Sequence, residues 1–511
     1  MQTQMSFLID SNVVITAEPF NGRLEELQPV VSTFLRIAGE HGHKVYVHPA
    51  TLDDFKETSD SVHREQNIAA YAKYPALHEV AVPQHVLDVF PAPRSPNDDR
   101  DSRILAALDI GAVHFLVTND SKLRKRAARL GHESRVLRPD DAAAQLETWH
   151  PGAPPPPPSV EALNTYELYA SEPIFNSLRA TYADFDGWIA KVKAESASRR
   201  AWMVRGADGR YEALAIVKMR DSHPVAVGKD AIKLSTFKVA DFAAGRRLGE
   251  LLLKAVLRWA ANEYGRPSDM FVEVDASQDR LQEFLTDFGF IQVGVKDQNH
   301  PDEQVWLKTL DPPAGSDLEG LPHHIAYGPE AIRAGQPIFV IPIIPKWYED
   351  LFPDAEVFGP SGAVPISGAD PEPKAHGNAI KKAYLCRSPT NHIPPGSTLL
   401  FYRSQGGLKG DGAVVALGVA ERSHKSQDPI ETIELSFKRT VYSEEDVADL
   451  HNDGSAVLTI LFRHDRFIVP PWPVNRIASR RVSENFRWLM RRASVAASTS
   501  SGVRSAARST R

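Results

Sequence analysis

Cysteine is almost absent from this chain of 511 residues, with Cys386 as the single example. One thiol can form neither an internal disulfide nor a thiolate zinc cluster, so a metal site must use oxygen or imidazole ligands. No stretch reaches the roughly 18 uninterrupted apolar residues of a membrane span. The opening MQTQMSFLID also lacks a basic segment followed by a long apolar run. We therefore expect a cytoplasmic protein with no membrane partner.

The chain also lacks an excess of positive charge, because its formal net charge at pH 7 is -6. A polyanion such as RNA would therefore have to bind at local basic patches rather than through the charge of the whole protein. At about 150 residues per domain, the length predicts about three domains.

Proline and glycine mark the expected domain boundaries. The run PGAPPPPPS at 151–159 can form neither helix nor central strand, so we interpret it as a linker. A second stretch at 311–325, rich in proline, glycine and acids, is interpreted as another linker. The tail at 494–511 has three arginines, no acid and no aromatic residue, which predicts a disordered basic segment. The predicted domains are 1–150, 160–310 and 326–480.

In the first domain, apolar runs at 6–10, 44–49 and 113–120 alternate with helical patterns, which predicts a parallel sheet covered by helices. Ligands bind beyond the carboxyl ends of such strands, where two of the runs end in an aspartate. Four acids meeting there would repel one another unless a cation such as Mg²⁺ or Mn²⁺ neutralised them. An aspartate before a helix can equally be an N-cap. The four predicted ligands are Asp10, Asp54, Asp101 and Asp120.

The stretches IDSNVVI, HPATLD, DSRILAALDIGAVHFLVTND and LRKRAARLG resemble the PIN-domain nuclease family. The resemblance implies that the four aspartates bind the metal and are the catalytic residues of a ribonuclease. For the second ligand, Asp53 and Glu57 compete with Asp54. The basic helix after Asp120 would contact RNA through Lys122, Arg124 and Lys125.

The second domain contains a predicted hairpin at 200–220 and a strand at 231–239, followed by AGRRLG and a helix. Free N–H groups at the start of a helix can hold a pyrophosphate. This order of elements resembles the GNAT acetyltransferase family, which implies a site for acetyl-CoA. The predicted cofactor-binding residues are Arg246, Arg247, Leu248, Gly249 and Glu250. Alternatively, Gly249 only permits close helix packing.

The catalytic residues that the GNAT resemblance implies are only partly present in this domain. In the family, the turn that appears here as FLTDFGF often carries a tyrosine general acid, and that position is Leu285. Glu273 or Asp275 on the preceding strand could accept a proton from an attacking amine, or either could be an ordinary polar strand residue.

The third domain has short strands bounded by glycine and proline, which predict a small β-barrel. The stretches IIPKWYEDLF, KKAYLCR, IPPGSTLLFYRS and AVVALGVAE resemble the PUA-like group that includes the ASCH and EVE domains. The resemblance implies an RNA-binding groove, for which Lys346, Trp347 and Arg387 are predicted contacts. Each of them could instead serve packing or lie on an ordinary surface.

The sequence therefore predicts a multidomain α/β and α+β protein. Its parts would be a PIN-like parallel α/β/α sandwich, a GNAT-like mixed sheet with helices and a PUA-like small β-barrel. The favoured function is a metal-dependent ribonuclease joined to an acetyl-CoA-dependent acyltransferase and an RNA reader. One alternative is an acetyltransferase acting on a protein or aminoacyl-RNA amine, with the outer domains selecting the substrate. Another is a non-catalytic RNA-binding regulator of toxin–antitoxin type, held by a protein antitoxin or as a homo-oligomer.

Overall fold

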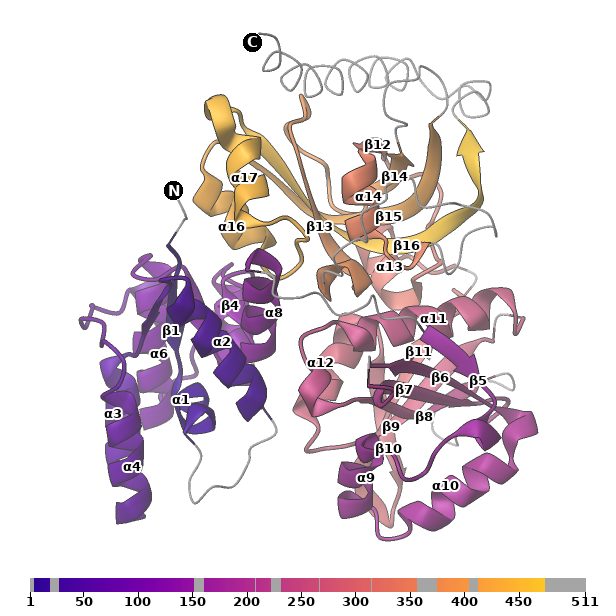
Figure 1. Ribbon diagram of the computed structural model, residues 1–511, viewed down its shortest axis with the longest axis horizontal. Coiled ribbons are helices and arrows are strands. Elements are labelled where there is room, and N and C mark those ends of the chain that lie inside the picture. The colour runs from indigo at the N-terminus through magenta and orange to yellow at the C-terminus, as the bar shows by residue number, and fades with distance from the viewer. Residues whose placement is uncertain are drawn as a thin grey trace, which may run out of the picture.

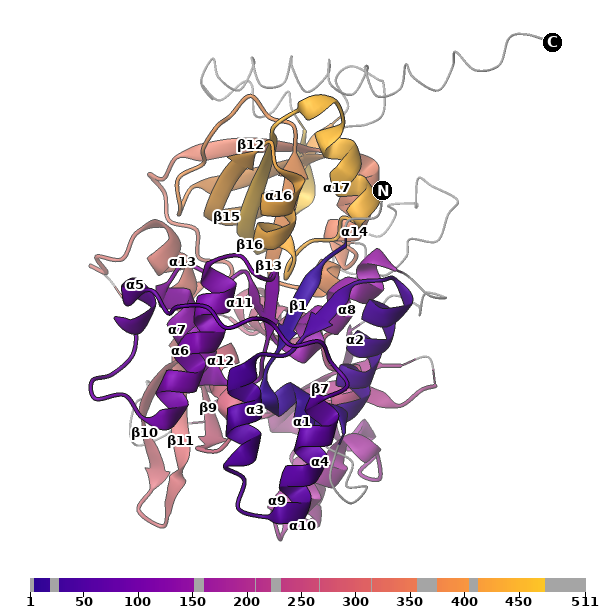
Figure 2. The ribbon, with the colours of Figure 1, turned by 90° about the vertical axis from the view of Figure 1, so that its left-hand side faces the viewer.

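Three separate sheets organise the chain in a computed structural model (Figure 1). The structure describes residues 4–18, 27–150, 160–206, 208–221, 231–265, 267–313, 315–355, 375–403 and 412–473. We call the described parts of 4–150, 160–313 and 315–473 the N-terminal, central and C-terminal units. The C-terminal unit lies above the other two in both views (Figures 1 and 2). Within these ranges, no helix has the length and apolar character needed to cross a membrane.

The N-terminal unit contains a four-stranded sheet in the order β2-β1-β3-β4, in which every neighbouring pair is parallel. The prediction of a parallel sheet is confirmed. Its strands are β1 (Ser6–Ile9), β2 (Lys44–Tyr46), β3 (Phe115–Val117) and β4 (Val136–Leu137). Its helices are α1 (Ser11–Ala17), α2 (Gln28–Glu40), α3 (Pro49–Lys56), α4 (Ser61–Tyr71), α5 (Gln84–Leu87), α6 (Pro96–Asp109), α7 (Ser121–Arg129) and α8 (Pro139–Trp149).

Two of the predicted ligands also begin helices. The Asp10 carboxylate accepts the Ser11 N–H at the start of α1. Asp120 accepts the N–H groups of Lys122 and Leu123 at the start of α7. These contacts satisfy N–H groups that have no partner within the helix. The N-cap role that the sequence left open therefore applies to both aspartates.

The central unit is built on a seven-stranded sheet in the order β10-β11-β9-β8-β7-β6-β5. Its pairs are antiparallel except for β8 and β9. The predicted hairpin is confirmed as β6 and β7. The strands are β5 (Val160–Leu163), β6 (Arg199–Arg205), β7 (Tyr211–Lys218), β8 (Ile232–Val239), β9 (Asp269–Asp275), β10 (Ile291–Asp297) and β11 (His300–Thr309). The helices are α9 (Asn176–Thr181), α10 (Phe185–Ala194), α11 (Leu248–Asn262) and α12 (Asp279–Asp287).

The C-terminal unit has a five-stranded sheet in the order β12-β14-β15-β16-β13. No backbone pairing joins β12 to β13 within the described residues, so a closed barrel stays a prediction. The Tyr384 hydroxyl on β13 nevertheless donates to the Pro342 carbonyl on β12 at 2.7 Å, so the two outer strands curl toward each other. The strands are β12 (Ile338–Ile343), β13 (Lys381–Cys386), β14 (Thr398–Arg403), β15 (Ala413–Ser426) and β16 (Val457–Pro473), and the helices are α13 (Gly320–Tyr327), α14 (Pro345–Leu351), α16 (Pro429–Ser436) and α17 (Glu444–His451).

The expected linkers are only partly described. Residues 151–159 and the tail 494–511 lie outside the described residues. The segment 311–325 is not wholly a linker, because its last residues begin α13. This helix is held to the central unit by Lys308, whose buried ammonium donates to the carbonyls of Phe288, Ile325 and Ala326.

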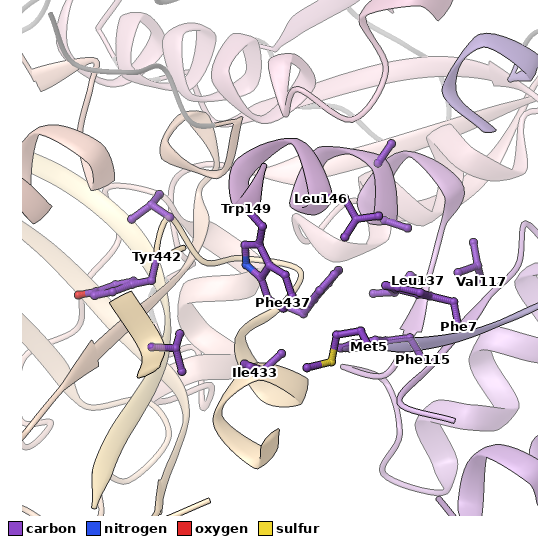
Figure 3. Packing of buried hydrophobic residues seen from close by; sticks show 14 of the residues in the cluster. Met5, Phe7, Phe115, Val117, Leu137, Leu146, Trp149, Ile433, Phe437 and Tyr442 are labelled. Carbon is purple, nitrogen blue, oxygen red and sulfur yellow. The ribbon is translucent and has the colours of Figure 1, made fainter. Parts of the chain in front are cut away.

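One hydrophobic core runs through both the N-terminal and the C-terminal units. Phe437, which follows α16, is fully buried against the N-terminal sheet and α8. Its ring centroid lies 4.3 Å from that of Phe115 and 5.1 Å from that of Trp149 (Figure 3). The two units therefore share apolar surface whose exposure would destabilise both.

Candidate functional site

A cleft opens between β8 and β9 in the central sheet. These strands pair over only two positions, Ile232 with Met270 and Lys233 with Phe271. Beyond them, β8 stays paired with β7 and β9 stays paired with β11, so the two strands separate toward their carboxyl ends. A cavity of about 2360 Å³ lies at this opening. Residues of both strands line it, namely Thr236, Phe237, Lys238, Val272 and Val274.

The turn after β8 brings the start of α11 to the same cavity. Gly245 has φ of +85°, and a Cβ atom there would lie 2.7 Å from the Asp140 carbonyl oxygen, so the position requires glycine. Arg247 precedes α11 in the left-handed conformation at φ of +56°. The predicted residues Arg247, Leu248, Gly249 and Glu250 all line the cavity. Their N–H groups stand in the first turn, where a helix offers unpaired donors.

The arginine charges, however, are already used within the chain. Arg246 forms an ion pair with Glu212 at 2.6 Å. Arg247 pairs with Asp141 of α8 at 2.7 Å. Each guanidinium group is therefore held by a carboxylate of this protein, and binding of phosphates by either arginine stays a prediction.

The side chain of Glu250 is also bonded within the chain. Its carboxylate accepts the backbone N–H groups of Ile380 at 2.7 Å and Lys381 at 3.0 Å. These bonds tie the first turn of α11 to β13 of the C-terminal unit. What Glu250 can still offer a ligand is its backbone N–H.

The cleft can accommodate a cofactor of the kind that the resemblance implies. Small-molecule pockets usually measure about 300–1,000 Å³, so this cavity has room for a cofactor and an acceptor together. A Cβ atom at Gly249 would lie 3.6 Å from Phe284 and 3.7 Å from Phe237, which is ordinary contact. A single methyl group would therefore fit there against the two rings, which also line the cavity. The apolar strand residues and the unpaired N–H groups of the first turn of α11 fit a long, partly apolar chain that ends in phosphates.

The catalytic groups expected from the sequence are placed less favourably. Leu285 is fully buried in the central core. Glu273 is held between two ammonium groups, with Lys233 at 2.6 Å and Lys296 at 3.4 Å. The hydroxyl and then the backbone N–H of Ser277 bind the carboxylate of Asp275 and lower its pKa. Both carboxylates are therefore engaged by neighbouring groups of the chain.

In the N-terminal unit, the predicted acids interact at the carboxyl end of the sheet. The Asp10 carboxylate accepts from Asn12 at 2.6 Å and from Thr118 at 2.7 Å. Burial raises the pKa of Asp10; the hydrogen bonds from Thr118 and the Ser11 N–H oppose this effect, and the charges of Asp120 and Asp54 add to it. Burial, followed by the charges of Asp10 and Asp120, raises the pKa of Asp101 to about 7.

Arginines neutralise part of this negative charge. Arg126 of α7 pairs with Asp101 at 2.7 Å and also with Asp98. Arg100 lies 3.5 Å from Asp54 and 2.8 Å from Glu57. Among the residues the structure describes, no three His, Cys, Asp or Glu side chains are grouped so that they could hold a metal ion. The premise that only dications could compensate these acids is therefore wrong, and the roles of the four aspartates as metal ligands stay predictions.

Some of the predicted RNA contacts are engaged elsewhere. One guanidinium nitrogen of Arg124 donates to both carboxylate oxygens of Glu283 of α12, at 2.8 and 2.7 Å, whereas Lys122 and Lys125 are exposed on α7. Arg387 donates to the carbonyls of Asp449, Leu450 and Asn452 at the end of α17, which is a structural contact rather than a free surface charge.

Trp347 and Lys346 form a small cluster on α14. The Trp347 ring stacks on Tyr442 with a centroid distance of 4.1 Å. The Lys346 ammonium lies 4.3 Å from the centre of the Trp347 ring and 3.1 Å from Asp446. Trp347 therefore takes part in packing, and RNA binding by either residue stays a prediction.

All three units meet beside α11, and the sequence did not predict this junction. Glu283 binds Arg124 and Arg138 of the N-terminal unit, and Arg280 pairs with Asp140. Lys438 of the C-terminal unit lines the same cavity. The sequence carried one signal, the acids of RPDD at the start of α8, but nothing in it indicated that they face another unit.

Comparisons with known proteins give partial likenesses. No family model and no curated protein matches the chain. Solved structures that match include the N-acetyltransferase PseH of Campylobacter jejuni, at 12% identity over 30% of this chain and 99% of that one, with a TM-score of 0.22. A GNAT family acetyltransferase from Elizabethkingia anophelis with acetyl-CoA bound has 12% identity, 30% and 98% coverage and a TM-score of 0.22. One from Staphylococcus aureus has 12% identity, 30% and 100% coverage and a TM-score of 0.24. TM-scores this low decide neither the fold nor the activity of this chain.

Proposed function

We propose that this protein is an acyl-CoA-dependent N-acyltransferase whose cofactor binds between β8 and β9. The observation that carries the proposal is the separation of these parallel strands around a cavity that also reaches the first turn of α11. A cleft at the carboxyl ends of diverging strands, next to a helix N-terminus, is a common location for a phosphate-bearing ligand. The resemblance of AGRRLG and FLTDFGF to GNAT sequences supports the same ligand.

Each side of the cleft has a distinct role in this proposal. An acyl-CoA supplies an acyl group activated as a thioester. Phe237, Val272 and Val274 would exclude water around its chain, since they line the opening. Leu248, Gly249 and Glu250 would direct backbone N–H groups toward its phosphates.

The acceptor amine has to be neutral when it attacks, because an ammonium has no lone pair. Glu273 is held by two lysines, and the pKa of Asp275 is lowered by Ser277. Both carboxylates are thus already engaged within the chain and are not directed at an amine. In this proposal the amine loses a proton to solvent and attacks the thioester carbonyl. The C–S bond breaks as the amide bond forms, and the coenzyme A thiolate takes a proton from solvent.

A matched pair of substitutions at Gly249 tests the cofactor site. Gly249→Ala adds a methyl group that makes only ordinary contacts with Phe284 and Phe237. Gly249→Trp places an indole against these two rings, whose centroids are only 5.3 Å apart, so its bulk enters the cavity beside the loop. Calorimetric titration of the full chain with acetyl-CoA should show binding in the parent and in Gly249→Ala, and none in Gly249→Trp. Binding in all three proteins, or in none, would contradict the proposal.

Metal-dependent hydrolysis of RNA by the N-terminal unit is a second candidate. Its support is the hydrogen-bonded group of Asp10, Asn12 and Thr118 at the carboxyl end of the sheet, next to Asp120. In this candidate, Asp10, Asp54, Asp101 and Asp120 would hold Mg²⁺ or Mn²⁺, and the C-terminal unit would bind the RNA. The parent should bind Mn²⁺ in calorimetry and cleave structured RNA, whereas an Asp10→Asn/Asp120→Asn double variant should do neither. Absence of heat with both metals would exclude it.

A further inference from the structure

Lys438 stands beside the start of α11 although it belongs to another unit. It follows Phe437, which is buried in the N-terminal core, and precedes Arg439, which pairs with Glu421. Its own carbonyl accepts a bond from the Arg247 guanidinium at 2.9 Å. The position of Lys438 is therefore fixed from both sides, and its side chain lines the large cavity.

Most cations around Lys438 are already neutralised. Arg247 pairs with Asp141, Lys381 with Asp287, and Arg439 and Arg463 with Glu421. The Lys438 ammonium instead donates to a neutral group, the Glu133 carbonyl, at 2.7 Å. Within the described residues, no carboxylate forms an ion pair with it. An ammonium has three donors, so Lys438 keeps both charge and hydrogen-bonding capacity for a ligand.

The same junction contains other polar atoms without partners. The Arg247 Nε–H is buried and has no acceptor among the described residues. One carboxylate oxygen of Asp140, a residue only 4% exposed, is buried and has no donor. Buried polar groups are normally hydrogen-bonded, so such atoms indicate a missing ligand or solvent partner. A ligand that satisfied them would carry both acceptors and donors, as a phosphate linked to hydroxyl or amide groups does.

We propose that Lys438 binds a phosphate of the acyl-CoA, so that the C-terminal unit completes the cofactor site of the central unit. This inference rests on the proposed function. It explains how phosphates are neutralised although Arg246 and Arg247 are paired with carboxylates. Burial lowers the pKa of Lys438 to about 8. The charge of Asp141 opposes this effect, and the charges of Arg439, Lys381 and Arg247 add to it.

The test compares ligands with and without phosphates. Coenzyme A and pantetheine share their thiol end, but pantetheine has no phosphate. Calorimetric titration of the full chain should show that Lys438→Gln weakens coenzyme A binding about tenfold to a hundredfold, the range for a hydrogen bond to a charged group. Pantetheine binding should not change. Lys438→Arg should retain most of the coenzyme A affinity, and Lys191→Gln, on an exposed lysine of α10, is the control.

Each outcome has a separate meaning. If the parent binds neither ligand, the proposed function fails, and this inference fails with it. If the parent binds coenzyme A and Lys438→Gln binds it equally well, the role of Lys438 is refuted while the function stands. An equal loss for coenzyme A and pantetheine would show that the substitution only disturbs the junction, which also refutes the inference. Thermal unfolding of each variant checks that the protein is folded.

Discussion

Removing the Phe437 side chain should loosen the N-terminal unit, although Phe437 lies more than 280 residues beyond it in the chain. The ring is fully buried and contacts Phe115, Trp149 and Phe7, at centroid distances of 4.3, 5.1 and 6.2 Å. Phe437→Ala therefore leaves a cavity inside the shared core. Substitutions of this kind usually cost about 3–5 kcal/mol, of which aromatic contacts account for about 0.5–1.5 kcal/mol per pair.

Amide hydrogen exchange measures this effect locally, which matters because a protein of several units has no single free energy of unfolding. The opening free energy of amides in β1 and β3 should fall by about 3–5 kcal/mol in Phe437→Ala. Phe242→Ala is the matched control, since that ring is 53% exposed and a surface substitution usually changes stability by less than about 0.5 kcal/mol. If exchange in β1 and β3 is unchanged while α16 becomes less protected, the two units do not share a cooperative core.

Three further predictions concern charge. Glu283→Gln should weaken the contact between the N-terminal and central units by about 2–4 kcal/mol, because it leaves Arg124 and Arg138 without their carboxylate. A double-mutant cycle with Arg138→Met measures the coupling free energy, and Glu263→Gln at an exposed position is the control. Burial lowers the pKa of His48 to about 4 against an ordinary value of 6.5, so the stability that its neutral ring provides is complete above pH 6.5 and is lost as the pH falls toward 4. His48→Asn keeps an acceptor for the Ala50 N–H, and its unfolding free energy should fall less steeply over this range, by up to roughly 3 kcal/mol; equal slopes would refute the assignment. For acyl transfer, kcat/KM should rise about tenfold per pH unit up to the pKa of the acceptor amine and then level off, whereas a bell-shaped profile would reveal an acid or base that the cleft does not show.

The sequence predicted those parts of the fold that depend on local pattern. Alternating apolar runs identified the parallel strands β1, β2 and β3. The hairpin of β6 and β7 followed from two strands around a short polar turn. The loop before α11 was found because glycine next to a helix start is a local feature, and the structure places four of the five predicted residues on the cavity wall.

Whether the charged side chains at these positions are already paired within the protein could not be predicted from the sequence. Arg246 and Arg247 were predicted to bind the cofactor, yet Glu212 and Asp141, both distant in the sequence, pair with them in space. Glu250, three residues after Arg247, adds a longer contact at 3.7 Å. Arg124 was expected to contact RNA but binds Glu283 of α12. The partners Glu212, Asp141 and Glu283 lie at least 34 residues away along the chain.

The order of residues by itself determined the strands, the helix starts and the positions of the polar groups, because hydrophobic periodicity and capping act over a few neighbouring residues. Tertiary structure alone decided which charges are cancelled and which remain. Electrostatic interaction depends on distance and burial rather than on position in the chain. Lys438 shows the difference, since the packing of Phe437 against the N-terminal sheet brings it to the cavity beside β8 and β9 of another unit.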